Sequence, residues 1–172
     1  MTATTATTTE RDDLVAMLEQ HRQLLLRTTQ GMDEAQLRAT PTVSELCLGG
    51  IVKHVTAMEE GWVRFIESGP AYEGAPDESV YAAHVASFQM TDQESGPGLL
   101  ERYRQVADRT DELVRSLPSL DATQPLPAAP WFEPGARWTA RRSLVHIVAE
   151  TAQHAGHADI IRETIDGAKS MG

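Results

Sequence analysis

Apolar residues recur every three or four positions in four long stretches of the chain, and this spacing predicts four amphipathic helices. The stretches are residues 10–30, 47–69, 99–117 and 138–166. Each is followed by glycine or proline, in order Gly31, Pro70, Pro118 and Gly167. Helices commonly end at such residues, and no stretch shows the alternating pattern of a half-buried strand. The pattern therefore predicts an all-α fold, a four-helix bundle.

Several polar residues are candidates for starting these helices. Thr139 is placed to cap the last helix. Residues 32–46 form a connector in which Thr42 or Ser44 is a candidate cap for the second helix. Residues 71–95 give an ambiguous pattern that includes one short helix.

A long connection joins the third and fourth helices. Residues 121–138 hold four of the nine prolines and show no helical period. A connection of this length inside a compact domain is usually functional or lies across the fold. Its aromatic residues, Trp131, Phe132 and Trp138, could pack it down or line the mouth of a pocket.

The totals narrow the class of protein. A length of 172 residues predicts one domain, residues 10–172, after a threonine-rich tail over residues 1–9 that we expect to be disordered. A net charge of −10 argues against nucleic acid and against an anionic membrane surface as partners. The single cysteine, Cys47, permits no internal disulfide, and no apolar run approaches the about 18 residues of a membrane span. We expect a cytoplasmic protein.

The last helix concentrates side chains that can bind a metal. His146, Glu150, His154 and His157 are spaced 4, 4 and 3 residues apart. At about 100° of rotation per residue, the four side chains fall within about 80° of one another. Helical histidines often make only local hydrogen bonds. Four such residues on one stripe instead favour a metal site, which one ligand from another helix would complete.

The second helix offers that further ligand. His54 lies on the apolar face of this helix, between Gly50 and Gly61. These glycines would permit close contact or leave space beside the histidine. A buried histidine needs a polar partner. His54 alone would be interpreted as a hydrogen-bonded core residue, but together with the stripe on the last helix it becomes a candidate metal ligand.

Three other residues are given structural interpretations. His21, on the apolar face of the first helix, is predicted to be a packed histidine. Cys47 is near the start of the second helix, where a thiol pKa can be lowered, but a small buried residue is the simpler interpretation. His84 is predicted to be a surface or packing residue.

Spacing leaves the choice of ligands on the last helix open. Three pairs compete: Glu150 with His154, His146 with Glu150, and His154 with His157. A pair four residues apart converges on an ion better than a pair three apart, although both occur in bundles. His146 and His154 are about 12 Å apart along the helix axis, so at most one of them can bind a given ion.

Two segments resemble a known family. GGIVKHVTAMEEGW and HIVAETAQHAGHADIIRETIDG are similar to the DinB-like superfamily of four-helix metal proteins. The closest branch contains thiol-dependent S-transferases and mycothiol-dependent maleylpyruvate isomerases. In the superfamily one histidine of helix two and two of helix four bind the metal, and Arg-Gly-Gln follows the last. Here His54 matches the first ligand, Glu150 replaces the second and His154 matches the third, followed by 155–157 as Ala-Gly-His.

The resemblance implies a ligand set and an activity. It selects His54, Glu150 and His154 as metal ligands, with His157 and His146 next to them facing ligands or substrate. Two histidines and one carboxylate suit zinc, and nickel can enter during purification. The metal would activate a thiol cosubstrate such as mycothiol for S-transfer to, or isomerisation of, a small electrophile. The alternative is a metal-binding or stress-response bundle without turnover.

The aromatic residues also bear on the oligomeric state. Trp62, Phe65 and the aromatic residues of the 121–138 connection could leave an apolar patch larger than a monomer usually exposes. We therefore expect a homodimer.

Overall fold

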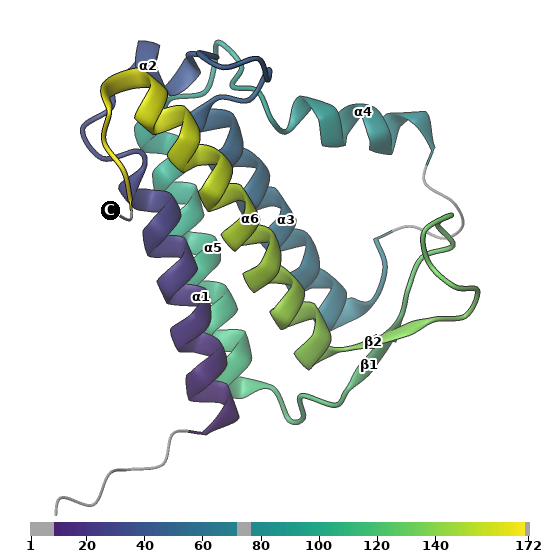
Figure 1. Cartoon of the computed structure of the whole chain (residues 1–172). Coiled ribbons are helices and arrows are strands. Elements are labelled where there is room, and N and C mark those ends of the chain that lie inside the picture. Colours follow the sequence, from purple (N-terminus) through teal and green to yellow (C-terminus); the bar gives the residue numbers. More distant parts are fainter. Residues whose placement is uncertain (1–8, 72–76, 171–172) are drawn as a thin grey trace, which may run out of the picture.

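A computed structural model of the protein describes residues 9–71 and 77–170. This part of the chain is mostly helical, as the apolar spacing predicts, with one small two-stranded sheet (Figure 1). In chain order the elements are α1 (Glu10–Arg27), α2 (Glu34–Arg38), α3 (Leu48–Ser68), α4 (Glu78–Ala86), α5 (Gly96–Ser116), β1 (Thr123–Pro125), β2 (Arg137–Thr139) and α6 (Ala140–Asp166). The tail predicted over residues 1–9 lies outside the described residues, except for Thr9, which caps α1.

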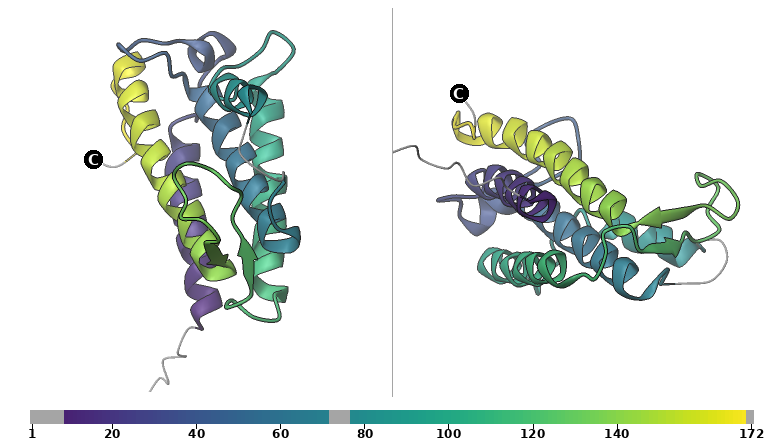
Figure 2. Two further views of the ribbon diagram at one scale, coloured as in Figure 1. Left: turned by 90° about the vertical axis from the view of Figure 1, so that its right-hand side faces the viewer. Right: turned by 90° about the horizontal axis from the view of Figure 1, so that it is seen from below.

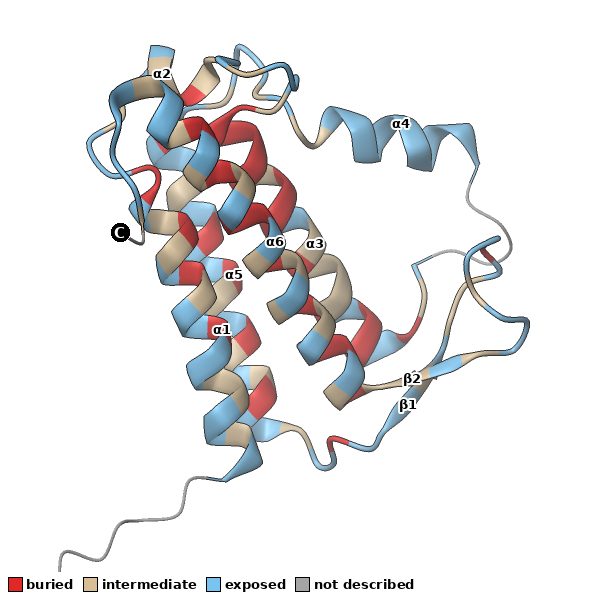
Figure 3. Ribbon diagram, in the orientation of Figure 1, coloured by how far each residue is buried: buried red, intermediate tan, exposed pale blue. Residues whose placement is uncertain are grey.

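The four long helices α1, α3, α5 and α6 lie side by side. Helix α6 packs against α1 and α3, and α3 packs against α5. Their buried residues face one another and form two apolar clusters (Figure 3). The short helix α4 and the β1–β2 hairpin lie beside α3 and α6, on the side of the molecule away from α1 (Figure 2). Helix α4 contributes no buried residue.

Helix α6 begins and ends where the sequence predicts. The hydroxyl of Thr139 accepts a hydrogen bond from the backbone N–H of Arg142. At the other end Gly167 adopts a left-handed conformation with φ of 79°, and its N–H donates to the carbonyl of Glu163. A left-handed residue after the last turn favours glycine because other side chains are strained there. These two ends fix the register of the histidine stripe.

Helix α3 begins at a different residue from those predicted. Its N-cap is Cys47, whose sulfur accepts a hydrogen bond from the N–H of Gly50 at 3.3 Å. Thr42 and Ser44 instead accept hydrogen bonds within the preceding loop, from the N–H groups of Ser44 and Leu46 respectively. The prediction of Thr42 or Ser44 as the cap is therefore wrong. The simpler interpretation of Cys47 holds in that the residue is buried.

Gly50 allows a close approach that positions the chain after α4. A Cβ atom at this position would collide with the backbone carbonyl of Phe88. Gly61, two turns further from His54 than Gly50, differs because a Cβ there would meet nothing within 4 Å. The two glycines thus serve the two purposes that the sequence left open, since one permits contact and the other leaves space.

The connections contain structure that the sequence patterns did not reveal. Strands β1 and β2 pair antiparallel, with Gln124 opposite Trp138. These three-residue strands are too short to give an alternating pattern. Helix α5 starts earlier than predicted because Ser95 caps it and Gly96–Gly98 form its first turn. Among the described residues, no helix has the length and apolar character needed to cross a bilayer.

A buried charged group joins three of the long helices. The guanidinium of Arg22 on α1 donates to Glu59 on α3 and, at 2.8 Å, to Asp111 on α5. Arg22 is 2% exposed and Glu59 is fully buried. Paired charges of this kind hold the helices in one register, because removing either partner leaves the other charge buried without compensation.

Candidate metal centre

Three candidate ligands from the second and last long helices converge. His54 projects from α3, and Glu150 and His154 project from α6. One ligand atom from each lies within 4.8 Å of the other two. Both histidines are buried and the carboxylate is half-buried. Among the described residues, this is the group of metal-binding side chains that comes together, and it has the composition that the family resemblance implies.

The proton on the His54 ring is fixed by its neighbour Ser87. The Nδ1 atom of His54 lies 2.8 Å from the hydroxyl oxygen of Ser87. That hydroxyl donates its only hydrogen to the backbone carbonyl of His84 at 2.6 Å. Ser87 therefore accepts from His54, and the ring proton is on Nδ1. The Nε2 lone pair is left free, which is the form of histidine that binds a metal.

The surroundings of His54 keep it neutral. Its ring stacks on Phe88 at a centroid distance of 3.8 Å and meets the ring of His154 edge-on at 4.8 Å. Burial lowers the pKa of His54 to about 4, with a smaller contribution from the nearby His154 and His84. A neutral imidazole is thus present at pH 7 without any cost of deprotonation on metal binding.

Glu150 lies between two histidines of its own helix. One carboxylate oxygen is 3.7 Å from Nε2 of His146, and the other is 3.7 Å from Nε2 of His154. Burial lowers the pKa of both imidazoles, while the charge of Glu150 opposes this shift. Glu150 can therefore pair with either histidine, but the converging group contains His154 and not His146.

The other residues of the stripe lie on either side of this group. His146 contacts Trp62 and Trp138 edge-on, at centroid distances of 4.9 and 5.3 Å. His157 has its ring centre 5.4 Å from that of His154. Within the described part of the chain, the buried Nδ1 atoms of His154 and His157 have no hydrogen-bond partner. Such groups are rare in folded proteins and often mark a site for a ligand.

Helix α4 supplies residues that sequence reasoning missed. His84, predicted to be a surface or packing residue, is exposed but meets the ring of His54 edge-on at 5.2 Å. Ser87 and Phe88 were not singled out at all. The only signal was the spacing of His84 and Ser87, three residues apart and hence on one face of a short helix. Nothing local in the sequence connects that face with His54.

The residues given other interpretations stay outside the group. His21 is half-buried on α1. Cys47 is buried at the start of α3, with its sulfur 3.9 Å from the carbonyl oxygen of Phe88. Neither belongs to the converging set of the described residues.

The donor set fits a divalent metal. It offers two neutral imidazoles and a carboxylate, and one imidazole is already in the correct tautomer. The 4.8 Å span is slightly wider than the about 4.2 Å that two bonds of about 2.1 Å can bridge, so small side-chain rotations would close the group on an ion. Three protein ligands also leave a coordination position open, which is typical of catalytic sites.

The fold and this group define a mostly helical protein with a candidate metal centre of two histidines and one carboxylate. The mycothiol-S-transferase family matches residues 13–167, and the chain belongs to this family. The match confirms the resemblance indicated by the motifs around His54 and His154. The crystal structure of a conserved protein from Enterococcus faecalis has a similar fold, with a TM-score of 0.65. That likeness covers 94% of this chain and 100% of the other at 11% identity, while no curated protein matches the chain.

Proposed function

We propose that this protein is a zinc-dependent S-transferase that joins a small thiol of the mycothiol type to a small electrophile. Its four long helices would form a bundle of the DinB-like type that holds the metal. Membership of the mycothiol-S-transferase family supports the thiol. The observation that carries the proposal is the convergence of His54, Glu150 and His154, with Nε2 of His54 left free by Ser87.

The chemistry requires a thiolate. When bound, a divalent metal supplies Lewis acidity that lowers the pKa of a thiol and favours its thiolate form. Zinc is the choice because two histidines and one carboxylate are typical of its catalytic sites. In S-transfer the thiol sulfur forms a bond to the electrophilic carbon, the leaving group departs with its bonding electrons, and the thiol proton passes to a base. An isomerisation would instead end with release of the same thiol.

The protein's own side chains would orient the reactants. Ser87 and Phe88 hold the His54 ring through a hydrogen bond and a stacked contact. Glu150 is the negative group beside the two buried histidines. His157, next to His154 with an unpartnered Nδ1 among the described residues, is placed to hold the thiol or to receive its proton.

Metal analysis and a thiol-alkylation assay test this function. Protein purified without a nickel column should carry about one divalent metal per chain, or acquire it from added zinc. Mycothiol and 1-chloro-2,4-dinitrobenzene should then react faster than without protein. The gain should disappear with chelator and return with zinc. Absence of stoichiometric metal after zinc addition contradicts the proposal. Metal binding without any rate gain would favour the alternative, a metal-binding bundle without turnover.

A further inference from the structure

An apolar cleft of about 310 Å³ lies between α3 and the loop that joins β1 to β2. We call it the aromatic cleft, and its main walls are Met58, Gly61, Trp62, Phe65, Trp131 and Phe132. None of the residues that line it is charged. Ligand sites are commonly apolar hollows of this size with a few polar groups at one end.

The aromatic cleft continues from the candidate metal centre along α3. Met58 and Gly61 follow His54 by four and seven residues, so the three share one face of the helix. They lie about 6 and 10 Å from His54 along the axis, at about 1.5 Å per residue. On the other helix, the ring of Trp62 touches His146, whose Nε2 is 3.7 Å from Glu150. The polar end of the cleft is therefore the metal centre itself.

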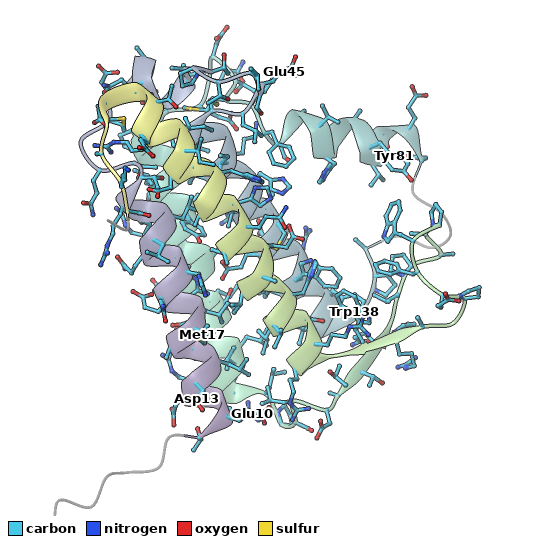
Figure 4. The ribbon with its side chains drawn as sticks, viewed as in Figure 1. Glu10, Asp13, Met17, Glu45, Tyr81 and Trp138 are labelled. Atoms are coloured by element: carbon cyan, nitrogen blue, oxygen red, sulfur yellow. The ribbon has the colours of Figure 1, made fainter. Side chains whose placement is uncertain are left out.

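The walls of the cleft are held in place by aromatic contacts. Trp62 stacks on Trp138 at 4.9 Å with the two rings 10° from parallel, and it meets Phe65 edge-on at 5.2 Å. On the outer side Trp131 is 58% exposed and approaches Tyr81 of α4 at 6.2 Å. Figure 4 labels Trp138 and Tyr81, which come from the hairpin and from α4 on the same side of α3. The floor is open at Gly61, where a Cβ would meet nothing within 4 Å.

We propose that the aromatic cleft binds the electrophile and that this electrophile is a neutral, flat aromatic or conjugated compound. The inference rests on the proposed function and names the substrate class of that site. Flat rings stack favourably between aromatic walls. An ionic substrate is disfavoured because its charge would be buried without a partner. The position of the cleft would present the reactive carbon of the electrophile towards His54 and Glu150.

The thiol is the less suitable occupant of this cleft. A thiol of the mycothiol type carries many hydroxyl groups, and apolar walls would leave them without hydrogen bonds. A second hollow of about 400 Å³ adjoins His84 on the other side of His54, and its lining includes Ser44, Glu45 and Gln89. Its polar lining suits the thiol, so the two substrates would approach the centre from opposite directions along α3.

Binding of an unreactive arene to the full-length protein tests the proposal. The probe is 1,3-dinitrobenzene, which quenches tryptophan fluorescence, titrated without thiol into metal-loaded and chelated protein. Quenching should saturate in both. Gly61→Leu, which fills the open floor, should weaken binding by about tenfold or more. The control Arg64→Leu, at an exposed position of the same helix, should stay within about twofold of wild type.

A second variant and a kinetic readout complete the test. Trp131→Ala truncates an exposed wall residue and should also weaken binding, so the test stands if Gly61→Leu loses its helical circular dichroism. In turnover, Gly61→Leu should raise KM for 1-chloro-2,4-dinitrobenzene and leave KM for the thiol unchanged. Non-saturating quenching, wild-type affinity in both cleft variants, or a rise in the thiol KM alone would overturn the inference. Because the binding readout needs neither metal nor thiol, its failure is distinguishable from failure of the proposed function.

Discussion

The hydroxyl oxygen of Ser87 lies 2.8 Å from Nδ1 of His54. Ser87 follows the last turn of α4, which has no buried residue, whereas His54 is buried in the middle of α3. A peripheral helix thus determines which ring nitrogen of a core histidine is available. Partners of this kind commonly tune the affinity of a metal site without touching the metal.

Ser87→Ala should therefore weaken metal binding. The loss of the acceptor frees the His54 ring to rotate and to exchange its tautomer, which should cost about 10–100-fold in zinc affinity. Competition with a zinc-binding dye measures the affinity. Ser79→Ala is a suitable control, because Ser79 lies on the same short helix and its hydroxyl contacts only Asp77. Equal affinities for the two variants would remove Ser87 from the site.

Single alanine variants should separate the ligands from their neighbours. His54→Ala and His154→Ala should lose stoichiometric zinc, since both belong to the converging group. His146→Ala should keep it, because His146 contacts Trp62 and Trp138 instead. Zinc content after gel filtration gives the result. If His154→Ala retains metal and His146→Ala loses it, the assignment is wrong by one turn pair of α6.

The metal-free protein should lose stability in acid through His54. Its pKa is about 4 when folded and 6.5 ordinarily, so between these values only the unfolded chain binds the proton. The free energy of unfolding should then fall as pH falls from 6.5 to about 4 and be unaffected by this group outside that window. His146 and His154, with pKa values also lowered by burial, contribute in the same direction.

Urea unfolding in the presence of chelator measures this dependence. His54→Leu removes one titrating group and should flatten the profile over the same window. A variant whose urea midpoint falls as steeply as that of wild type would show that His54 is not the group responsible.

Arg22 should matter for stability rather than for chemistry. Arg22→Leu leaves the fully buried Glu59 without its partner and should lower the free energy of unfolding by about 3–5 kcal/mol. Arg109→Leu breaks a surface pair with Glu67 and should cost less than about 1 kcal/mol. Equilibrium unfolding in urea compares them. Adding Glu59→Leu to Arg22→Leu should recover much of the loss, whereas no recovery would argue against an uncompensated charge as the cause.

The homodimer stays a prediction, and the structure suggests how to test it. Trp62 and Phe65 are wall residues of the aromatic cleft, so the exposed apolar surface that remains includes Val85 on α4, which is 65% exposed. Light scattering at micromolar concentration should give twice the chain mass of 18.8 kDa. Val85→Asp should reduce it, unlike Val145→Asp at another exposed position. A monomer mass for wild type contradicts the prediction.

The sequence predicted most of what depends on helical repetition. The ends of α6 and the stripe of His146, Glu150, His154 and His157 follow from a cap, a stop and a spacing, all of which are local. The contact of His54 with Ser87 is not local, since 33 residues separate them. The hairpin was missed for a related reason, because pairing of Gln124 with Trp138 depends on tertiary packing rather than on strand pattern.

Gly50 has a consequence for how the chain tolerates change. Any side chain there would displace the backbone at Phe88, and with it the acceptor that holds the His54 ring, although Gly50 has no functional group of its own. In a library of all single substitutions, position 50 should accept glycine alone, whereas Gly156 and Gly61 have room for alanine. The most restrictive position of the centre would then be one that no search for reactive residues could find.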